Sequence, residues 1–63
     1  MNLKELRESK FLTQDELAAK AGVSQFTVTR LESGLQKPYF STIKKLAKAL
    51  DVQPGEIRFD LKV

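Results

Sequence analysis

The chain of 63 residues contains no cysteine, no histidine and no tryptophan. Without cysteine, neither a disulfide nor a thiolate metal site can staple a small fold. Without histidine, the chain lacks the residue that serves most often as a general base and as a metal ligand. No apolar run approaches the roughly 18 residues of a membrane span, and the charged start MNLKELRESK is unlike a secretory leader. We therefore expect a soluble cytoplasmic protein that uses no cofactor, no metal and no membrane.

The residues that are present describe a small folded domain with a modest positive charge. Hydrophobic residues make up 41% of the chain and charged residues 30%, which is typical of a folded domain. The net charge is +3, which permits nucleic-acid binding without requiring it. A domain of this length buries only about 60% of its unfolded surface, so it is marginal unless it is well idealised or paired with a second copy.

Capping residues and apolar periodicity predict four helices and a short fifth. Asn2, Thr13 and Ser24 each precede a helical pattern as N-caps, and Thr13 begins the capping box Thr13-Gln14-Asp15-Glu16. Gly22 and Gly34 supply the left-handed residues at which the second and third helices end. The expected helices cover residues 3 to about 9–10, 14–21, 25–33, about 41–50 and about 54–57.

The second and third helices are separated only by Ala21-Gly22-Val23, and these small residues favour a close and steep crossing. On the third helix, Val28 and Leu31 share an apolar face. Phe26 lies about 160° away from Val28 at roughly 100° per residue, in a surrounding of Gln25, Thr29 and Arg30. A phenylalanine that faces away from the core, among polar side chains, indicates a contact surface.

The last seven residues, Ile57–Val63, alternate between apolar and polar without interruption, which is typical of a half-buried strand. A lone strand needs a partner for its backbone groups, and the simplest partner is the same strand of a second copy across a two-fold axis. A frayed tail and an extension of the fifth helix are the alternatives. The residues expected at this dimer interface are Ile57, Phe59, Leu61 and Val63.

The run LTQDELAAKAGVSQFTVTRLESGLQKP, with LRESK before it and STIKKLAKALDV after it, resembles the helix-turn-helix family of phage lambda repressor and Cro, often called the XRE family. The resemblance covers residues 2 to about 57. It implies an all-α, compact bundle of four to five helices whose third helix lies in the major groove of DNA. We expect a DNA-binding domain at residues 1–57 and a tail at residues 58–63 that holds the short C-terminal β-strand.

The resemblance assigns base contacts to the exposed face of the third helix. Gln25 suits a bidentate pair with adenine, and Phe26 suits the methyl group of thymine. Arg30 suits guanine or a phosphate, and Thr29 a base edge. The alternatives are a solvated glutamine, a phenylalanine packed on Tyr39 or on a dimer mate, and an arginine in a weak surface ion pair.

Backbone contacts are expected around this face. Gln14 opens the second helix, where the positive end of the helix favours a phosphate, and the resemblance also allows Gln14 to brace Gln25. The further phosphate contacts are expected from Ser24, Thr27, Lys37, Tyr39 and the backbone N–H of Phe40, whose side chain is expected in the core. The resemblance implies a structural ion pair between Arg7 and Glu32. Lys44, Lys45 and Lys48 are interpreted as a solvated helix face.

The leading hypothesis is a transcriptional regulator that binds double-stranded DNA as a homodimer on an inverted-repeat operator. A repressor is favoured over an activator. The rival is a protein-interaction module or an antitoxin-like protein that uses the C-terminal strand to bind a protein partner. An enzyme is disfavoured, because the chain lacks histidine and cysteine and leaves little room for a pocket of roughly 300 Å³.

Overall fold

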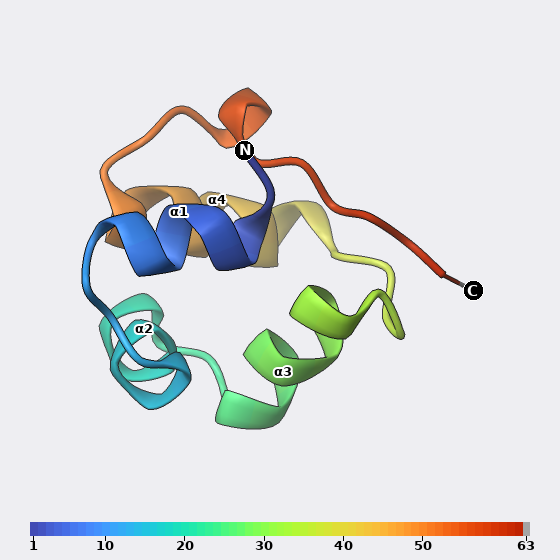
Figure 1. Ribbon diagram of the computed structural model, residues 1–63, viewed down its shortest axis with the longest axis horizontal. Coiled ribbons are helices and arrows are strands. Elements are labelled where there is room, and N and C mark those ends of the chain that lie inside the picture. Colours follow the sequence, from blue (N-terminus) through green and yellow to red (C-terminus); the bar gives the residue numbers. More distant parts are fainter. Residues whose placement is uncertain (63) are drawn as a thin grey trace.

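Side-chain caps fix the starts of the first three helices. The computed structural model describes residues 1–62. It contains α1 (Leu3–Ser9), α2 (Gln14–Ala21), α3 (Gln25–Ser33), α4 (Phe40–Leu50) and the single-turn 3-10 helix η1 (Pro54–Glu56), as Figure 1 shows. Asn2, Thr13 and Ser24 each accept a hydrogen bond from the backbone N–H three residues ahead. The predicted all-α fold and the bounds of α1, α2 and α3 are confirmed.

The turn between α2 and α3 depends on Gly22, which adopts the left-handed conformation with φ of 74°. Its backbone N–H bonds to carbonyls of the last turn of α2, and Val23 follows with a bond to the Ala18 carbonyl. A residue with a Cβ pays a steric cost in this conformation, whereas glycine does not. The chain can therefore reverse direction within three residues and place α3 steeply across α2.

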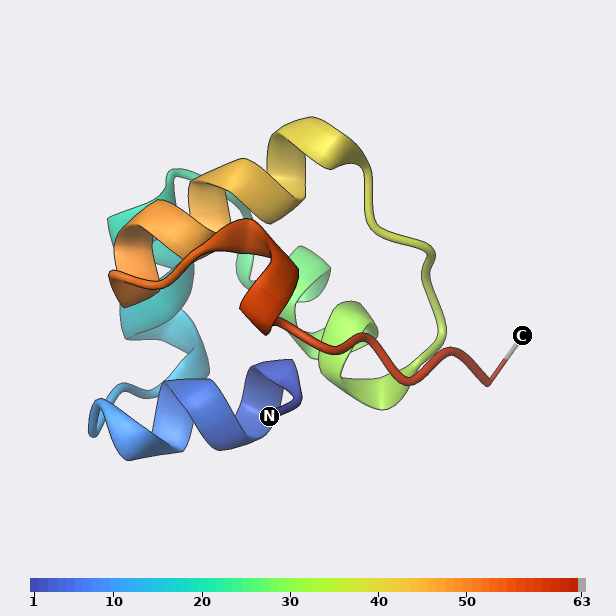
Figure 2. The same cartoon turned by 90° about the horizontal axis from the view of Figure 1, so that it is seen from above.

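The helices form two layers around one core. In Figure 1, α1 and α4 lie above α2 and α3, and Figure 2 shows the same arrangement from above. α2 packs against α3 and α4, α1 packs against α3, and η1 packs against α4. No helix within residues 1–62 has both the length and the apolar character to cross a membrane. The buried apolar side chains are Leu3, Leu6, Leu17, Ala18, Val28, Leu31, Leu46, Ala47, Ala49, Leu50 and Ile57.

The start of α4 differs from the prediction in two respects. The helix begins at Phe40, one residue earlier than expected, and the Phe40 side chain is 84% exposed instead of buried in the core. The buried residues of α4 all lie between Leu46 and Leu50. The assignment of Phe40 to the core is therefore wrong, because the first turn of α4 contributes no buried side chain.

The C-terminal segment is extended, but the expectation of a strand is wrong within the described residues. Its backbone finds partners in its own chain: the Arg58 N–H donates to the Met1 carbonyl at 3.0 Å and the Lys62 N–H donates to the Gly34 carbonyl at 2.9 Å. The only β-pairing among residues 1–62 is an isolated parallel bridge between Asn2 and Arg58. Figures 1 and 2 both show this segment running past the end of α3.

The four residues assigned to a dimer strand are therefore in different surroundings. Ile57 is 7% exposed and belongs to the core. Phe59 is half-buried and packs against that core, whereas Leu61 is 45% exposed. Val63 lies outside the described residues. The reason for the difference is that η1 turns the chain back onto the bundle before the alternating segment begins.

Candidate nucleic-acid interface

α3 separates a buried face from an exposed one. Val28 and Leu31 are 0% and 3% exposed, and they hold the helix on the core. Phe26 is 73% exposed, as the sequence predicts for a side chain on the opposite side. Gln25 and Arg30 are also exposed, and Thr29 is half-buried. The four residues predicted to contact bases thus lie on one helix whose orientation is fixed by its apolar side.

Phe26 and Arg30, one helical turn apart, form a joint surface. The guanidinium carbon of Arg30 lies over the Phe26 ring, 6.0 Å from its centroid. A cation over an aromatic face is attracted by the negative face of the ring, and this attraction restricts the long arginine side chain. The pair therefore presents a flat apolar ring beside a planar group of hydrogen-bond donors.

The predicted ion pair between Arg7 and Glu32 is present and fixes α1 to α3. The Arg7 Nε donates to Glu32 Oε2 at 2.6 Å and Nη2 donates to Oε1 at 3.1 Å. Nη1 donates to the Leu12 carbonyl at 2.7 Å. Only 11% of the Arg7 side chain and 5% of the Glu32 side chain are exposed. The hydrogen bond to Glu32 raises the pKa of Arg7 above its ordinary value, against the opposing effect of burial.

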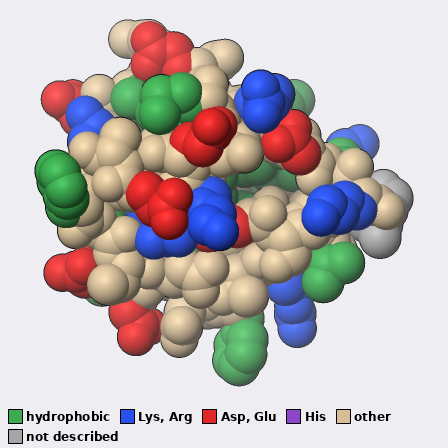
Figure 3. All heavy atoms as spheres, in the orientation of Figure 1, with side chains coloured by type: hydrophobic (Ala, Val, Ile, Leu, Met, Phe, Trp, Pro, Cys, Tyr) green, Lys and Arg blue, Asp and Glu red, His purple; other side chains and the backbone are tan. Residues whose placement is uncertain are grey.

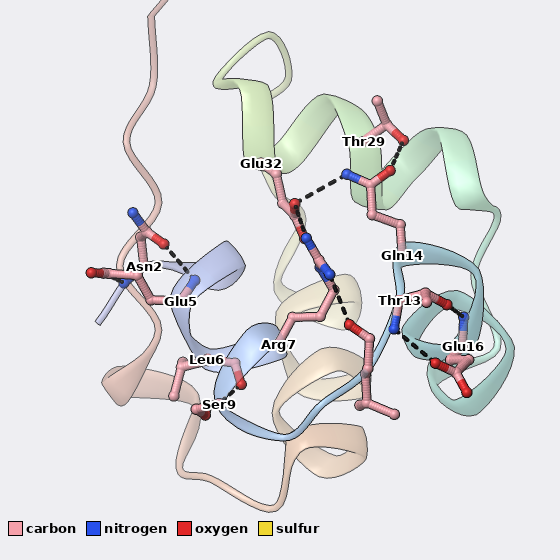
Figure 4. Close-up of polar contacts among 11 residues, drawn as sticks. Asn2, Glu5, Leu6, Arg7, Ser9, Thr13, Gln14, Glu16, Thr29 and Glu32 are labelled. Carbon is pink, nitrogen blue, oxygen red and sulfur yellow. Dashed lines mark hydrogen bonds and ion pairs between the residues drawn. The ribbon is translucent and has the colours of Figure 1, made fainter.

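Gln14 links this pair to Thr29 of α3, as Figure 4 shows. Its Nε2 donates to Glu32 Oε1 at 3.1 Å, and its Oε1 accepts a hydrogen bond from the Thr29 hydroxyl at 2.9 Å. The sequence suggested that Gln14 braces Gln25, whereas the structure shows it bonded to Glu32 and Thr29. Four side chains from α1, α2 and α3 therefore form one connected network.

The charge on α3 suits an anionic ligand. Glu32 is the single acidic residue among the nine residues of the helix, and its carboxylate is bound to Arg7. The exposed side of α3 therefore carries the positive charge of Arg30 without an unpaired acidic neighbour on the same helix. The face in Figure 3 is mixed in charge, since acidic and basic side chains are interspersed over it.

The residues predicted to contact phosphates lie around α3, but they differ in whether their polar groups already have a hydrogen-bond partner. The hydroxyls of Ser24 and Thr27 are 3.0 Å apart, and Ser24 also caps the helix. Lys37 and Tyr39 are exposed in the loop before α4. Tyr39 is the N-cap of α4 and gives no side-chain cap, so the first N–H groups of that helix, including that of Phe40, have no bond from it.

Sequence reasoning missed the bond between Thr29 and Gln14. A usable signal was present, because Thr29 and Glu32 are three residues apart and so share one face of α3. Since the resemblance already linked Arg7 to Glu32, a polar residue at the start of α2 was placed to reach both. What the pattern did not contain was the crossing angle that brings Gln14 between them.

The sequence comparisons place the chain among regulators. A helix-turn-helix family model matches residues 3–57. The HTH-type transcriptional regulator y4dJ of Sinorhizobium fredii is 41% identical over 56 residues, which is 89% of this chain and 73% of that protein. The HTH-type transcriptional repressor RghR of Bacillus subtilis is 45% identical over 51 residues, which is 79% of this chain and 38% of that protein. The chain spans only 21% of the length of similar mycobacterial regulators.

The fold has a close counterpart among solved structures. The restriction-modification controller protein C.AhdI from Aeromonas hydrophila superposes with a TM-score of 0.84 and is 41% identical. The match covers 86% of this chain and 82% of that protein. On the capped α2–turn–α3 unit, the family model and these similarities, the chain belongs to the helix-turn-helix family of DNA-binding transcriptional regulators, in its XRE type.

Proposed function

We propose that the protein is a sequence-specific regulator that reads double-stranded DNA by placing α3 in the major groove. The observation that carries the proposal is the orientation of α3, whose apolar side is buried while Phe26 is 73% exposed. A ring in that position suits contact with a thymine methyl, and Gln25 and Arg30 suit adenine and guanine edges. Repression is the proposed sign of regulation, supported by the similarity to the transcriptional repressor RghR.

Most of the affinity is proposed to come from phosphates. The backbone N–H groups at the start of α2 and of α4 suit an anion, because the first N–H groups of a helix lack internal partners and carry the positive end of its dipole. Gln14 is the first residue of α2. Lys37 and Tyr39 precede α4 in the chain, and Phe40 is its first residue. Ser24 and Thr27 are the remaining proposed contacts. Binding should therefore weaken steeply as salt rises.

We further propose that the protein binds as a homodimer, through exposed apolar side chains that include Leu61 and not through pairing of two strands. Leu61 and Leu35 flank the hydrogen bond that joins Lys62 to Gly34, and they are 45% and 61% exposed. Large apolar side chains that stay exposed on both sides of one backbone contact favour a protein contact. Under this proposal residues 1–57 read DNA and the tail contributes Leu61 to the interface, so that two α3 helices reach half-sites about 34 Å apart.

The rival role, in which the tail adds a strand to the sheet of a protein partner, has less support. That role needs free backbone groups on the tail, whereas Arg58 and Lys62 already donate their N–H groups within the chain. An antitoxin-like protein that binds both DNA and a partner would have to release these bonds. We therefore keep DNA reading as the proposed function.

Selection of tight-binding duplexes from a random DNA pool near physiological salt tests the proposal. We expect an enriched inverted repeat with half-sites about one helical turn apart. Each half-site should hold a thymine near Phe26 and an adenine near Gln25. A Leu61→Glu variant should enrich single half-sites instead, because it places a charge at the proposed dimer surface. The absence of any enrichment over bulk DNA would contradict the reading role.

A further inference from the structure

We propose that Thr29 acts in the groove as a hydrogen-bond acceptor only, because Gln14 takes the single proton of its hydroxyl. The inference rests on the proposed function, in which α3 lies against base edges. It assigns to one residue a defined polarity, and therefore a defined set of bases. The residues that impose this polarity, Gln14 and Glu32, are only partly exposed and do not themselves need to touch a base.

The polarity begins at a buried end of the network. Arg7 offers donors only, and the Glu32 carboxylate offers acceptors only. Gln14 therefore has to turn its NH2 group toward Glu32, with Nε2 3.1 Å from Oε1. The reversed amide would point its oxygen at a carboxylate that is 5% exposed, which is repulsive and leaves polar atoms unpaired away from water.

The fixed amide then sets the hydroxyl of Thr29. With its nitrogen on Glu32, Gln14 presents Oε1 on its other side, and a carbonyl oxygen accepts but never donates. The Thr29 Oγ1 lies 2.9 Å from this oxygen and must supply the proton. A threonine hydroxyl has one proton and two lone pairs, so the part of Thr29 that remains for a ligand is two lone pairs and a methyl group.

An acceptor in the major groove can pair with few base atoms. The amino groups of adenine (N6) and cytosine (N4) are donors there, whereas guanine N7 and O6 and thymine O4 are acceptors. Thr29 should therefore favour adenine or cytosine at the base it faces and disfavour a guanine or thymine at that place. An unconstrained threonine hydroxyl could rotate and pair with either class of base, because it can accept from an amino group or donate to a base acceptor.

Random-pool selection with two variants tests the inference. Thr29→Val keeps the shape and removes the hydroxyl, and Gln14→Met keeps the length and removes the amide. We expect the wild type to prefer an amino-bearing base at one position of each half-site by roughly three- to tenfold, the ratio for one hydrogen bond. Thr29→Val should lose that preference at that position alone. Gln14→Met should extend the preference there to guanine or thymine, because the hydroxyl proton is released.

Thr29→Ser serves as the matched control, since it keeps the hydroxyl and should keep the preference. It also keeps the test decisive if Gln14→Met fails to fold, because Thr29→Val and Thr29→Ser then differ only through the hydroxyl and the methyl group. The inference is overturned if Thr29→Val enriches the same bases as the wild type at every position, or if the position it affects held guanine or thymine. A wild type that enriches nothing would instead overturn the proposed function, and this inference with it.

Discussion

Arg7 of α1 and Glu32 of α3 are joined by two hydrogen bonds, of 2.6 Å and 3.1 Å, with almost no exposure of either side chain to solvent. The pair ties the first helix to the helix proposed to read DNA. A buried pair costs desolvation of both charges, so its presence adds little net stability. Loss of one partner is different, because it leaves an uncompensated charge in the interior.

Arg7→Met should therefore be among the most damaging single changes outside the apolar core. We expect it to lower the free energy of unfolding by roughly 3–5 kcal/mol, measured by urea denaturation followed by circular dichroism. Lys4→Met, on the same helix and exposed, should change it by less than about 0.5 kcal/mol. Equal losses in the two variants would contradict the role given to the ion pair.

Gly34 and Gly22 share a left-handed conformation but differ in their surroundings. A Cβ at Gly22 meets nothing within 4 Å, whereas a Cβ at Gly34 clashes with the Asp60 carbonyl and lies 3.0 Å from the Lys62 nitrogen. Gly22→Ala should cost roughly 1–2 kcal/mol, the strain of the conformation alone. Gly34→Ala should cost clearly more and should speed hydrogen exchange of the Lys62 amide. Unchanged exchange at Lys62 in Gly34→Ala would contradict the contact between the tail and α3.

Phe11 carries strain that a substitution can remove. Its φ is 58°, unusual for a residue with a Cβ, and its side chain is 94% exposed, so the ring contributes little packing. Phe11→Gly should raise the free energy of unfolding by up to about 1 kcal/mol. Phe11→Ala, which keeps the Cβ, should give no comparable gain. A thermal melt of both variants checks this, and a loss of stability in Phe11→Gly would show that the ring has a packing role.

Arg30 should contribute to DNA affinity out of proportion to its charge. Under the proposed function, Arg30→Ala should weaken binding to the enriched duplex by roughly 5- to 150-fold, the ratio for one specific base contact. Lys48→Ala removes the same charge from the exposed face of α4 and should have a small effect that vanishes at higher salt. Fluorescence anisotropy titrations at two salt concentrations separate the cases. Equal losses in both variants would place Arg30 outside the reading surface.

Stability should fall on the acid side and stay level near neutrality. Hydrogen bonds from Thr13 lower the pKa of Glu16, and the hydrogen bond from Arg58 lowers the pKa of Asp60. A carboxyl whose pKa is lower in the folded state stabilises the fold above its unfolded pKa of roughly 4, and loses this effect as the pH falls through the folded value. With no histidine, the melting temperature should be level between about pH 5.5 and 7. Glu16→Gln should melt with a smaller acid-side drop, and an identical drop would contradict the effect of the cap.

The helices were predictable because residues close in the sequence determine where each helix begins and ends. Asn2, Thr13 and Ser24 cap the residues that directly follow them, and Gly22 and Gly34 end helices by their own backbone freedom. The exposure of Phe26 followed from its position on the helical wheel. In each case the controlling residues lie within one or two turns of the feature, so no knowledge of the packing was needed.

The tail and the start of α4 were not predictable, because distant residues decide them. The alternation of residues 57–63 is compatible with a strand in a dimer, but the carbonyls of Met1 and Gly34 satisfy its backbone instead. Phe40 is apolar, yet its side chain is 84% exposed, and the buried residues of α4 lie between Leu46 and Leu50. The bond between Thr29 and Gln14 likewise depends on the crossing of α2 and α3. Local sequence patterns do not indicate which distant residues come into contact in the fold.

Amide chemical-shift mapping with a duplex of arbitrary sequence at low salt shows which surface meets DNA, and it needs no operator. Non-specific binding depends on the same phosphate-facing surface. If α3 reads DNA, the largest shifts should fall at Gln14, at residues 25–30 and at residues 37–40, with little change at Lys44, Lys45 and Lys48. Shifts confined to the tail or to the exposed face of α4 would contradict the claim that α3 is the surface that reads DNA.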